Sequence, residues 1–134
     1  MHIIIQHYLQ TRRRLGMEEL YYTQDITPIH LPQPFDDVDE NEDKQTFNQW
    51  CDVIDKYYKA LAVNNSRYPL QTLELRKRLF TLRFIYLIND SKVAEILELN
   101  SGAYSRHKKP VVDTFLEVVG VSDEKVARFA TYIS

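Results

Sequence analysis

Residues 91–109 read SKVAEILELNSGAYSRHKK, and this stretch decides how the rest of the chain is interpreted. A helix-turn-helix unit needs a short first helix held by small and apolar residues. Its second helix must be sharply capped and must offer polar and basic side chains to the DNA major groove. Ala94 is the small residue at which two helices can cross, and Leu97 and Leu99 hold the turn. Because Asn100 is a good N-cap for the helix that follows, the stretch predicts a helix-turn-helix unit built to meet DNA.

The second helix of this unit carries most of the residues that we expect to touch DNA. Helical spacing places positions 101, 104, 105 and 108 on one face, where side chains can meet base edges or phosphates. Basic residues beside that face are expected to hold phosphates. The predicted DNA-binding set comprises Arg76, Arg78, Lys92, Ser101, Tyr104, Ser105, Arg106, Lys108 and Lys109.

Two further residues of this helix affect the prediction. His107 is interpreted as either a phosphate contact or a partly buried neighbour. Pro110 cannot donate a hydrogen bond to the Arg106 carbonyl, and its ring clashes there. We therefore expect a kink or break near 107–110, which limits the recognition segment to about 101–109.

Charge is unevenly distributed along the chain. The net charge of −2 taken alone argues weakly against a nucleic-acid partner. Residues 66–110, however, hold nine basic and four acidic residues, whereas residues 21–55 hold one basic and nine acidic residues. A phosphate backbone responds to the field within about one Debye length, roughly 10 Å. The local positive balance of residues 66–110 is therefore compatible with double-stranded DNA as a partner.

Apolar residues recur at three- and four-residue steps along the chain, without strand-like alternation or an internal repeat. The fold class expected is all-α, a helical bundle with a C-terminal helix-turn-helix. Residues 1–65 would hold the N-terminal helices and an acidic loop, and residues 66–134 the DNA-binding region. Gly120 is expected to cap the fifth helix. Helices are expected over residues 3–22, 44–62, 70–88, 91–98, 101–119 (with the break near Pro110) and 123–133.

Two other segments carry alternatives. The aromatic-rich face of the helix over 44–62, with Trp50 and Tyr57, is either core or a protein contact, and we choose it as the contact of a homodimer. The loop over 23–43 contains six acidic residues among positions 36–43. This acidic run is a solvated linker, a mimic of DNA that folds back on the basic unit, or a contact for a basic partner. Its Asp37-x-Asp39-x-Asn41 spacing lacks the glycine and the final glutamate of a calcium loop.

Several function classes are not expected. The single cysteine, Cys51, excludes an internal disulfide and fits a reducing compartment. The four histidines are scattered, and we expect no metal site or other cofactor. No glycine-rich phosphate loop and no activated nucleophile is present, so an enzyme is not expected. No stretch is long enough to span a bilayer, and the apolar run Ile3–Ile5 is too short for a signal peptide, so a cytoplasmic location is expected.

Residues 97–115, LELNSGAYSRHKKPVVDTF, resemble the C-terminal segment of ArpU-type phage transcriptional regulators and, more distantly, RinA-type activators. The layout of Val93-Ala94 and Leu97-x-Leu99 also resembles region 4 of primary sigma factors. The resemblance covers about residues 70–119. It implies control of late phage genes within a bacterial host cytoplasm. The positions that match the ArpU-type pattern are Tyr104, Arg106, Lys108, Lys109, Val111 and Phe115.

The chain departs from that pattern at three positions, and alternatives remain open. Glu98 stands where a turn glycine is usual, His107 replaces an apolar residue, and Pro110 replaces a basic one. A structural helix pair that binds no DNA has the same spacing. Two other interpretations are an adaptor that binds host RNA polymerase or another protein without reading DNA, and a DNA-packaging recognition subunit. Salt-dependent duplex binding would distinguish DNA binding from an adaptor role.

Overall fold

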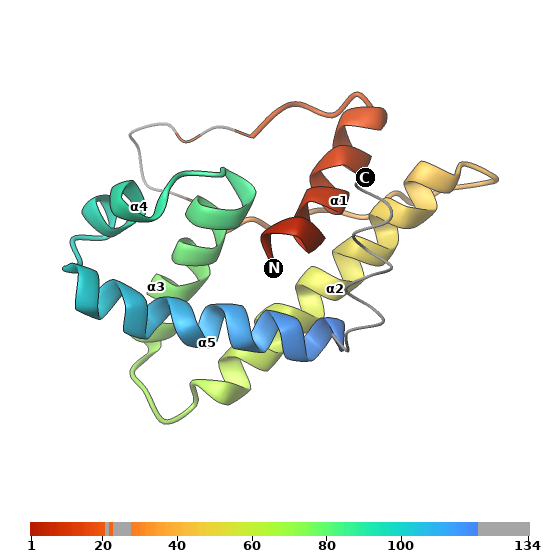
Figure 1. Ribbon diagram of the computed structural model, residues 1–134. Coiled ribbons are helices and arrows are strands. Elements are labelled where there is room, and N and C mark those ends of the chain that lie inside the picture. Colours follow the sequence, from red (N-terminus) through yellow and green to blue (C-terminus); the bar gives the residue numbers. More distant parts are fainter. Residues whose placement is uncertain (21, 23–27, 121–134) are drawn as a thin grey trace.

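The computed structural model describes residues 1–20, 22 and 28–120, and within these ranges the chain is an all-helical bundle (Figure 1). The expected fold class is therefore confirmed at the level of an all-α protein. The helix expected over 123–133 lies outside the described residues. The helical elements are α1 (His2–Arg14), α2 (Glu42–Asn64), α3 (Leu70–Phe80), a π-helical turn η1 (Thr81–Ile85), α4 (Asp90–Ile96) and α5 (Ser101–Val119).

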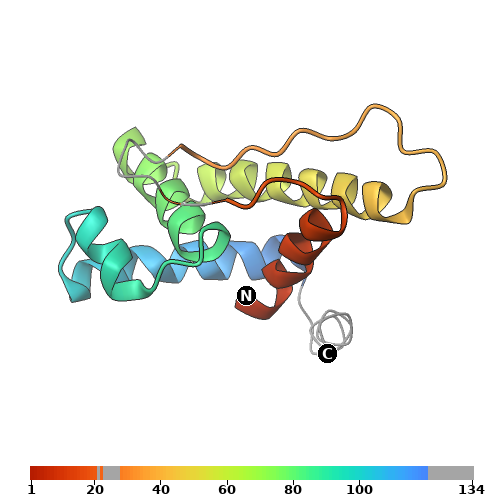
Figure 2. The same ribbon diagram turned by 90° about the horizontal axis from the view of Figure 1, so that it is seen from above.

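The longest helix, α2, supplies the centre of the core. It begins after Asn41, whose side chain accepts a hydrogen bond from the Lys44 backbone N–H. Trp50 is 4% exposed and Tyr57 is fully buried, and α2 packs against both α1 and α5 (Figure 2). The aromatic face that we chose as a homodimer contact is thus interior, so that choice is wrong. Other buried residues of the same face are Phe47, Ile54, Tyr58 and Leu61.

The first helix is shorter than the expected range of 3–22. Gly16 takes a left-handed conformation with φ 68°, and its N–H bonds to the Arg13 carbonyl. The N–H of Met17 bonds to the Arg12 carbonyl at 3.1 Å, which completes a Schellman motif. The helix therefore ends at Arg14, because the glycine terminates it rather than interrupting it.

The end of α3 continues directly into the π-helical turn. The N–H of Tyr86 bonds to the Thr81 carbonyl at 2.9 Å, and Leu87 then adopts a left-handed conformation with φ 60°. The range expected to be helical, 70–88, is thus helical to Ile85. This turn directs the chain into α4.

An extended segment over residues 28–35 crosses the bundle and is held by polar contacts. The His30 ring lies 2.7 Å from the Tyr8 hydroxyl, and the His30 carbonyl accepts a hydrogen bond from Tyr58 at 2.9 Å. Asn48 exchanges two hydrogen bonds with the Phe35 backbone. The segment thereby covers the aromatic core formed by α1 and α2.

The acidic run that follows this segment lies at the end of the molecule away from α4 in both views (Figures 1 and 2). Asp43 pairs with Arg14 of α1 at 3.0 Å, and Asp37 accepts a hydrogen bond from the Asp39 backbone. In this structure the run does not fold back on the basic unit, so the hypothesis that it mimics DNA there is not supported.

One buried cluster joins both halves of the chain. It includes Ile5 and Tyr8 from α1 together with Leu82, Val93 and Phe115 from the C-terminal elements. The boundary expected near residue 65 therefore does not separate two cores. No helix within residues 1–20 and 28–120 combines the length and apolar character needed to cross a membrane.

Candidate nucleic-acid interface

Two helix caps and one Schellman motif define the arrangement of α4, the short turn and α5. Asn89 caps α4 by accepting from the Lys92 N–H at 2.9 Å, and Asn100 caps α5 by accepting from the Ala103 N–H at 2.8 Å. Between them, Glu98 has φ 57° and forms a Schellman motif, in which the Leu99 N–H bonds to the Ala94 carbonyl. The cap predicted at Asn100 is confirmed. Glu98 occupies a left-handed turn position, as its place in the sequence pattern indicated.

The contact between α4 and α5 is organised by the carboxylate of Asp90. Tyr104 donates a hydrogen bond to it at 2.6 Å, Lys108 contacts both oxygens at 3.0 and 3.1 Å, and Arg83 lies 3.1 Å away. Burial acts to raise the pKa of Asp90, but the hydrogen bonds of Tyr104 and Lys108 and the nearby cations outweigh it, so the pKa is lowered. The carboxylate therefore stays ionised and holds the two helices together.

This contact corrects two of the predicted base-reading residues. Tyr104 is only 5% exposed, and burial together with Asp90 raises the pKa of its hydroxyl. Lys108 is partly exposed but its ammonium is committed to Asp90. Both side chains lie on the α4 side of α5 rather than on its open face. The error arose because helical spacing identifies a face but does not tell which neighbour covers it.

The open face of α5 is formed by positions 101, 102, 105, 106 and 109, which helical spacing brings together. Ser101, Ser105, Arg106 and Lys109 are exposed, as predicted. Gly102 belongs to this face but was not among the predicted residues. A Cβ built on Gly102 would lie 3.6 Å from Arg106 Nη1, so this guanidinium lies over the first turn of the helix.

Helix α5 continues through Pro110 as one element from Ser101 to Val119, so the expected break is wrong. The reason lies on the buried side of the helix. Val111 and Phe115 are fully buried, and Tyr57 of α2 donates a hydrogen bond to the Val111 carbonyl at 3.1 Å. These contacts hold the second half of α5 in line although the Arg106 carbonyl has no donor at position 110. Gly120, with φ 67°, caps the helix as predicted.

Arg76 was predicted to be a phosphate contact at the surface, but its side chain is buried. It is 7% exposed, and its Nε donates to His107 Nδ1 at 3.2 Å. Its guanidinium also lies 4.9 Å from the ring centre of Tyr68. Burial and the charges of Arg76 and Arg106 lower the pKa of His107, so this ring is neutral and accepts the hydrogen bond. Of the two interpretations of His107, the partly buried neighbour is the one observed.

The remaining predicted phosphate contacts are exposed. Lys92 lies 3.4 Å from Glu95, and Lys109 lies 3.0 Å from Asp113. Exposed pairs of this kind contribute about 0–1 kcal/mol, so a phosphate can replace the carboxylate partner at little cost. Within the described part of the chain, Arg78 and Arg106 have no carboxylate at ion-pair distance.

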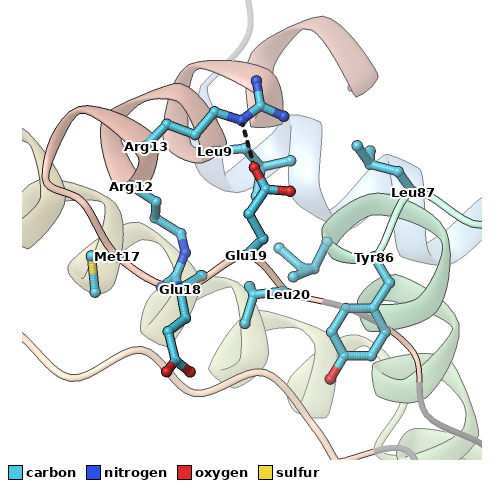
Figure 3. Close-up of a pocket in the computed structure, with 10 residues that line it drawn as sticks. Leu9, Arg12, Arg13, Met17, Glu18, Glu19, Leu20, Tyr86 and Leu87 are labelled. Carbon is cyan, nitrogen blue, oxygen red and sulfur yellow. Dashed lines mark hydrogen bonds and ion pairs between the residues drawn. The ribbon is translucent and has the colours of Figure 1, made fainter.

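A separate hollow lies at the end of α1 (Figure 3). Unlike Arg78 and Arg106, the arginines that line it have partners close by. Arg12 donates to the Glu18 carbonyl at 3.1 Å, and Arg13 pairs with Glu19 at 3.6 Å. The Glu18 carbonyl and the Glu19 carboxylate thus provide the partners of these two cations. We therefore interpret this hollow as part of the structure that ends α1. Tyr86 and Leu87 line its other side.

No family model, curated protein or solved structure matches the chain.

Proposed function

We propose that the chain binds double-stranded DNA through the open face of α5 and regulates transcription. The observation that carries the proposal is an exposed cationic face on the second helix of a capped helix-turn-helix arrangement. Ser101 and Ser105 are exposed and would meet base edges, and Arg106 would hold a phosphate or a guanine. Lys109, Lys92 and Arg78 add phosphate contacts around this face.

The first turn of α5 is favourable for an anion. Its N-terminus carries the positive end of the helix dipole, and Asn100 satisfies only one of the free backbone donors. The Arg106 guanidinium lies over the same turn. A phosphate placed there would meet backbone N–H groups and a guanidinium together.

The resemblance of residues 70–119 to ArpU-type regulators and to sigma region 4 supports transcription as the process, with late phage genes as its setting and a bacterial cytoplasm as its location. A single unit of this kind contacts few base pairs, so we expect two copies on a two-fold site. Their contact must involve a surface other than the buried aromatic face of α2.

The direct test is fluorescence anisotropy of a labelled random-sequence duplex as salt rises from roughly 50 to roughly 200 mM. About four phosphate contacts predict a slope of about −3.6 and a loss of affinity of roughly 150-fold over this range. The double variant Arg106→Ala with Lys109→Ala should lose most of the binding and lower the slope by about 2. Selection of preferred sequences from the random pool would then identify the target.

The matched control is Lys56→Ala with Lys59→Ala on the exposed side of α2. It removes the same charge, and both lysines pair with aspartates one helical turn away, as Lys109 does. This control should bind DNA like the wild type. Wild-type protein that fails to bind duplex DNA at low salt would overturn the proposal.

An adaptor role is the second candidate, and one observation favours it. The hollow between α3 and the α4–α5 turn, about 550 Å³, is lined by Leu70, Leu75, Ile96 and Leu97, with Leu70 71% exposed. Apolar side chains exposed together are typical of protein contacts. Binding to host RNA polymerase without duplex binding would support this role instead.

A further inference from the structure

A third hollow, of about 250 Å³, lies between the α2–α3 connection and the middle of α5. Four cationic side chains line it, namely Arg67, Arg76, Arg106 and Lys109. The lining includes one carboxylate, Asp113, which is already paired with Lys109. We propose that this hollow is a binding site for a phosphate group.

The charge of Arg76 is the first argument. It is 7% exposed, and within residues 1–20 and 28–120 no carboxylate lies at ion-pair distance from it. Its contacts are the neutral His107 ring and the Tyr68 ring. Buried charges are normally paired, because an uncompensated buried charge is costly. An anion in the hollow would supply the missing partner.

The arrangement around Tyr68 is the second argument. The guanidinium carbons of Arg67 and Arg76 lie 5.2 and 4.9 Å from the centre of this one ring. Cation–π contacts thus hold two like charges beside one ring, although they repel each other. Two planar guanidinium groups held beside a hollow suit the several oxygens of a phosphate, which accept paired N–H donors.

The remaining lining residues agree with this ligand. The pair of Lys109 with Asp113 is exposed, so Lys109 can turn to a phosphate at little cost. Asn65 also lines the hollow and is 3% exposed, and its Oδ1 has no hydrogen-bond partner among the described residues. A hydroxyl of the ligand or a water molecule would donate the missing hydrogen bond to this oxygen.

The phosphate can come from two sources, a backbone phosphodiester of DNA lying on α5 or a free phosphate compound. The inference rests on the hollow alone and goes beyond the proposed function. Calorimetric titration at low ionic strength with inorganic phosphate, and with a deoxynucleoside 5′-monophosphate, tests it directly. Saturable binding is expected, and Arg67→Gln should weaken it about tenfold by removing a charge-assisted contact.

Arg67 is exposed, so its substitution should leave the fold intact. Arg13→Gln is the matched control, because it removes the same charge from an exposed arginine that pairs with Glu19. It should leave phosphate affinity unchanged. Circular dichroism of both variants verifies that they fold.

Duplex binding of the same variants separates the two sources. If Arg67→Gln also lowers the DNA salt slope by about 1, the ligand is a backbone phosphate. If it weakens phosphate binding while DNA binding is unchanged or absent, the ligand is a free phosphate compound and the proposed site is supported. If neither probe binds saturably and the DNA slope is also unchanged by Arg67→Gln, the inference is overturned, even where duplex binding itself supports the proposed function.

Discussion

Lowering the pH from about 7 to about 5 should destabilise the fold mainly through His30. The His30 ring is partly buried beside Tyr8, and its backbone bonds to Thr81 and Tyr58. Burial, reinforced by the positive charge of Arg12, lowers the pKa of His30 from 6.5 to about 4. The folded protein therefore resists a proton that the unfolded chain accepts readily.

The sign and size of the effect follow from this difference. Because the folded-state pKa is the lower one, the stability is fully present above pH 6.5 and is lost as pH falls toward 4. At about pH 5 the loss relative to pH 7 is about 2 kcal/mol, and it levels off at about 3 kcal/mol below pH 4. The free energy of unfolding of such a domain is about 5–15 kcal/mol in total, so the change is readily measured.

Urea unfolding followed by far-UV circular dichroism across this pH range is the assay. His30→Leu should lower stability at neutral pH and flatten the curve by about 2 kcal/mol between pH 7 and pH 5. Gln33→Leu, at an exposed position in the same segment, adds the same side chain without removing a titrating group and should keep the wild-type slope. The reasoning is refuted if wild type and His30→Leu show the same pH dependence, or if NMR finds the His30 ring titrating near its ordinary pKa.

Two further substitutions test the α4–α5 unit. Glu98→Gly should stabilise the protein by about 1 kcal/mol, because glycine adopts the left-handed turn without strain. Glu95→Gly, in the regular part of α4, should instead destabilise it by about 1 kcal/mol, and thermal unfolding that ranks the two alike would contradict the assignment of the turn. Tyr104→Phe should cost about 1–2 kcal/mol in urea unfolding, because it removes the hydroxyl that bonds Asp90. The pKa of Asp90 should also rise, and the stability difference should shrink as pH falls below 3.8, so a difference that persists there would count against this bond.

Features set by neighbouring residues could be predicted from the sequence. Asn100 caps α5 through its own side chain, and Gly120 ends the same helix through its own backbone freedom. The apolar spacing of α2 identified its buried face, because one face of a helix is set by periodicity alone. Glu98 stands where the resembled pattern has a turn glycine, and its backbone is left-handed there.

Features set by contacts between distant residues could not be predicted in this way. Whether Pro110 breaks α5 depends on Tyr57, 53 residues earlier, which bonds the carbonyl beside it. The side to which Tyr104 turns depends on Asp90, whose carboxylate accepts the hydrogen bond of its hydroxyl. The burial of Arg76 depends on the path of the α2–α3 connection around Tyr68. No local pattern contains this information.

Under the proposed function, the difference between Lys108 and Arg106 would determine the side from which DNA approaches. A phosphate that took Lys108 would have to displace Asp90, which also holds Tyr104 and Arg83. It would thereby open the contact between α4 and α5 on which the unit depends. The approach that leaves this contact intact is from the side of Gly102, Arg106 and Lys109. Because Arg106 and Lys109 also line the cationic hollow, DNA on this side would bring its backbone beside Arg67 as well. The open face and the hollow would then bind successive phosphates of one strand, which is why a single substitution at Arg67 can reveal whether they act together.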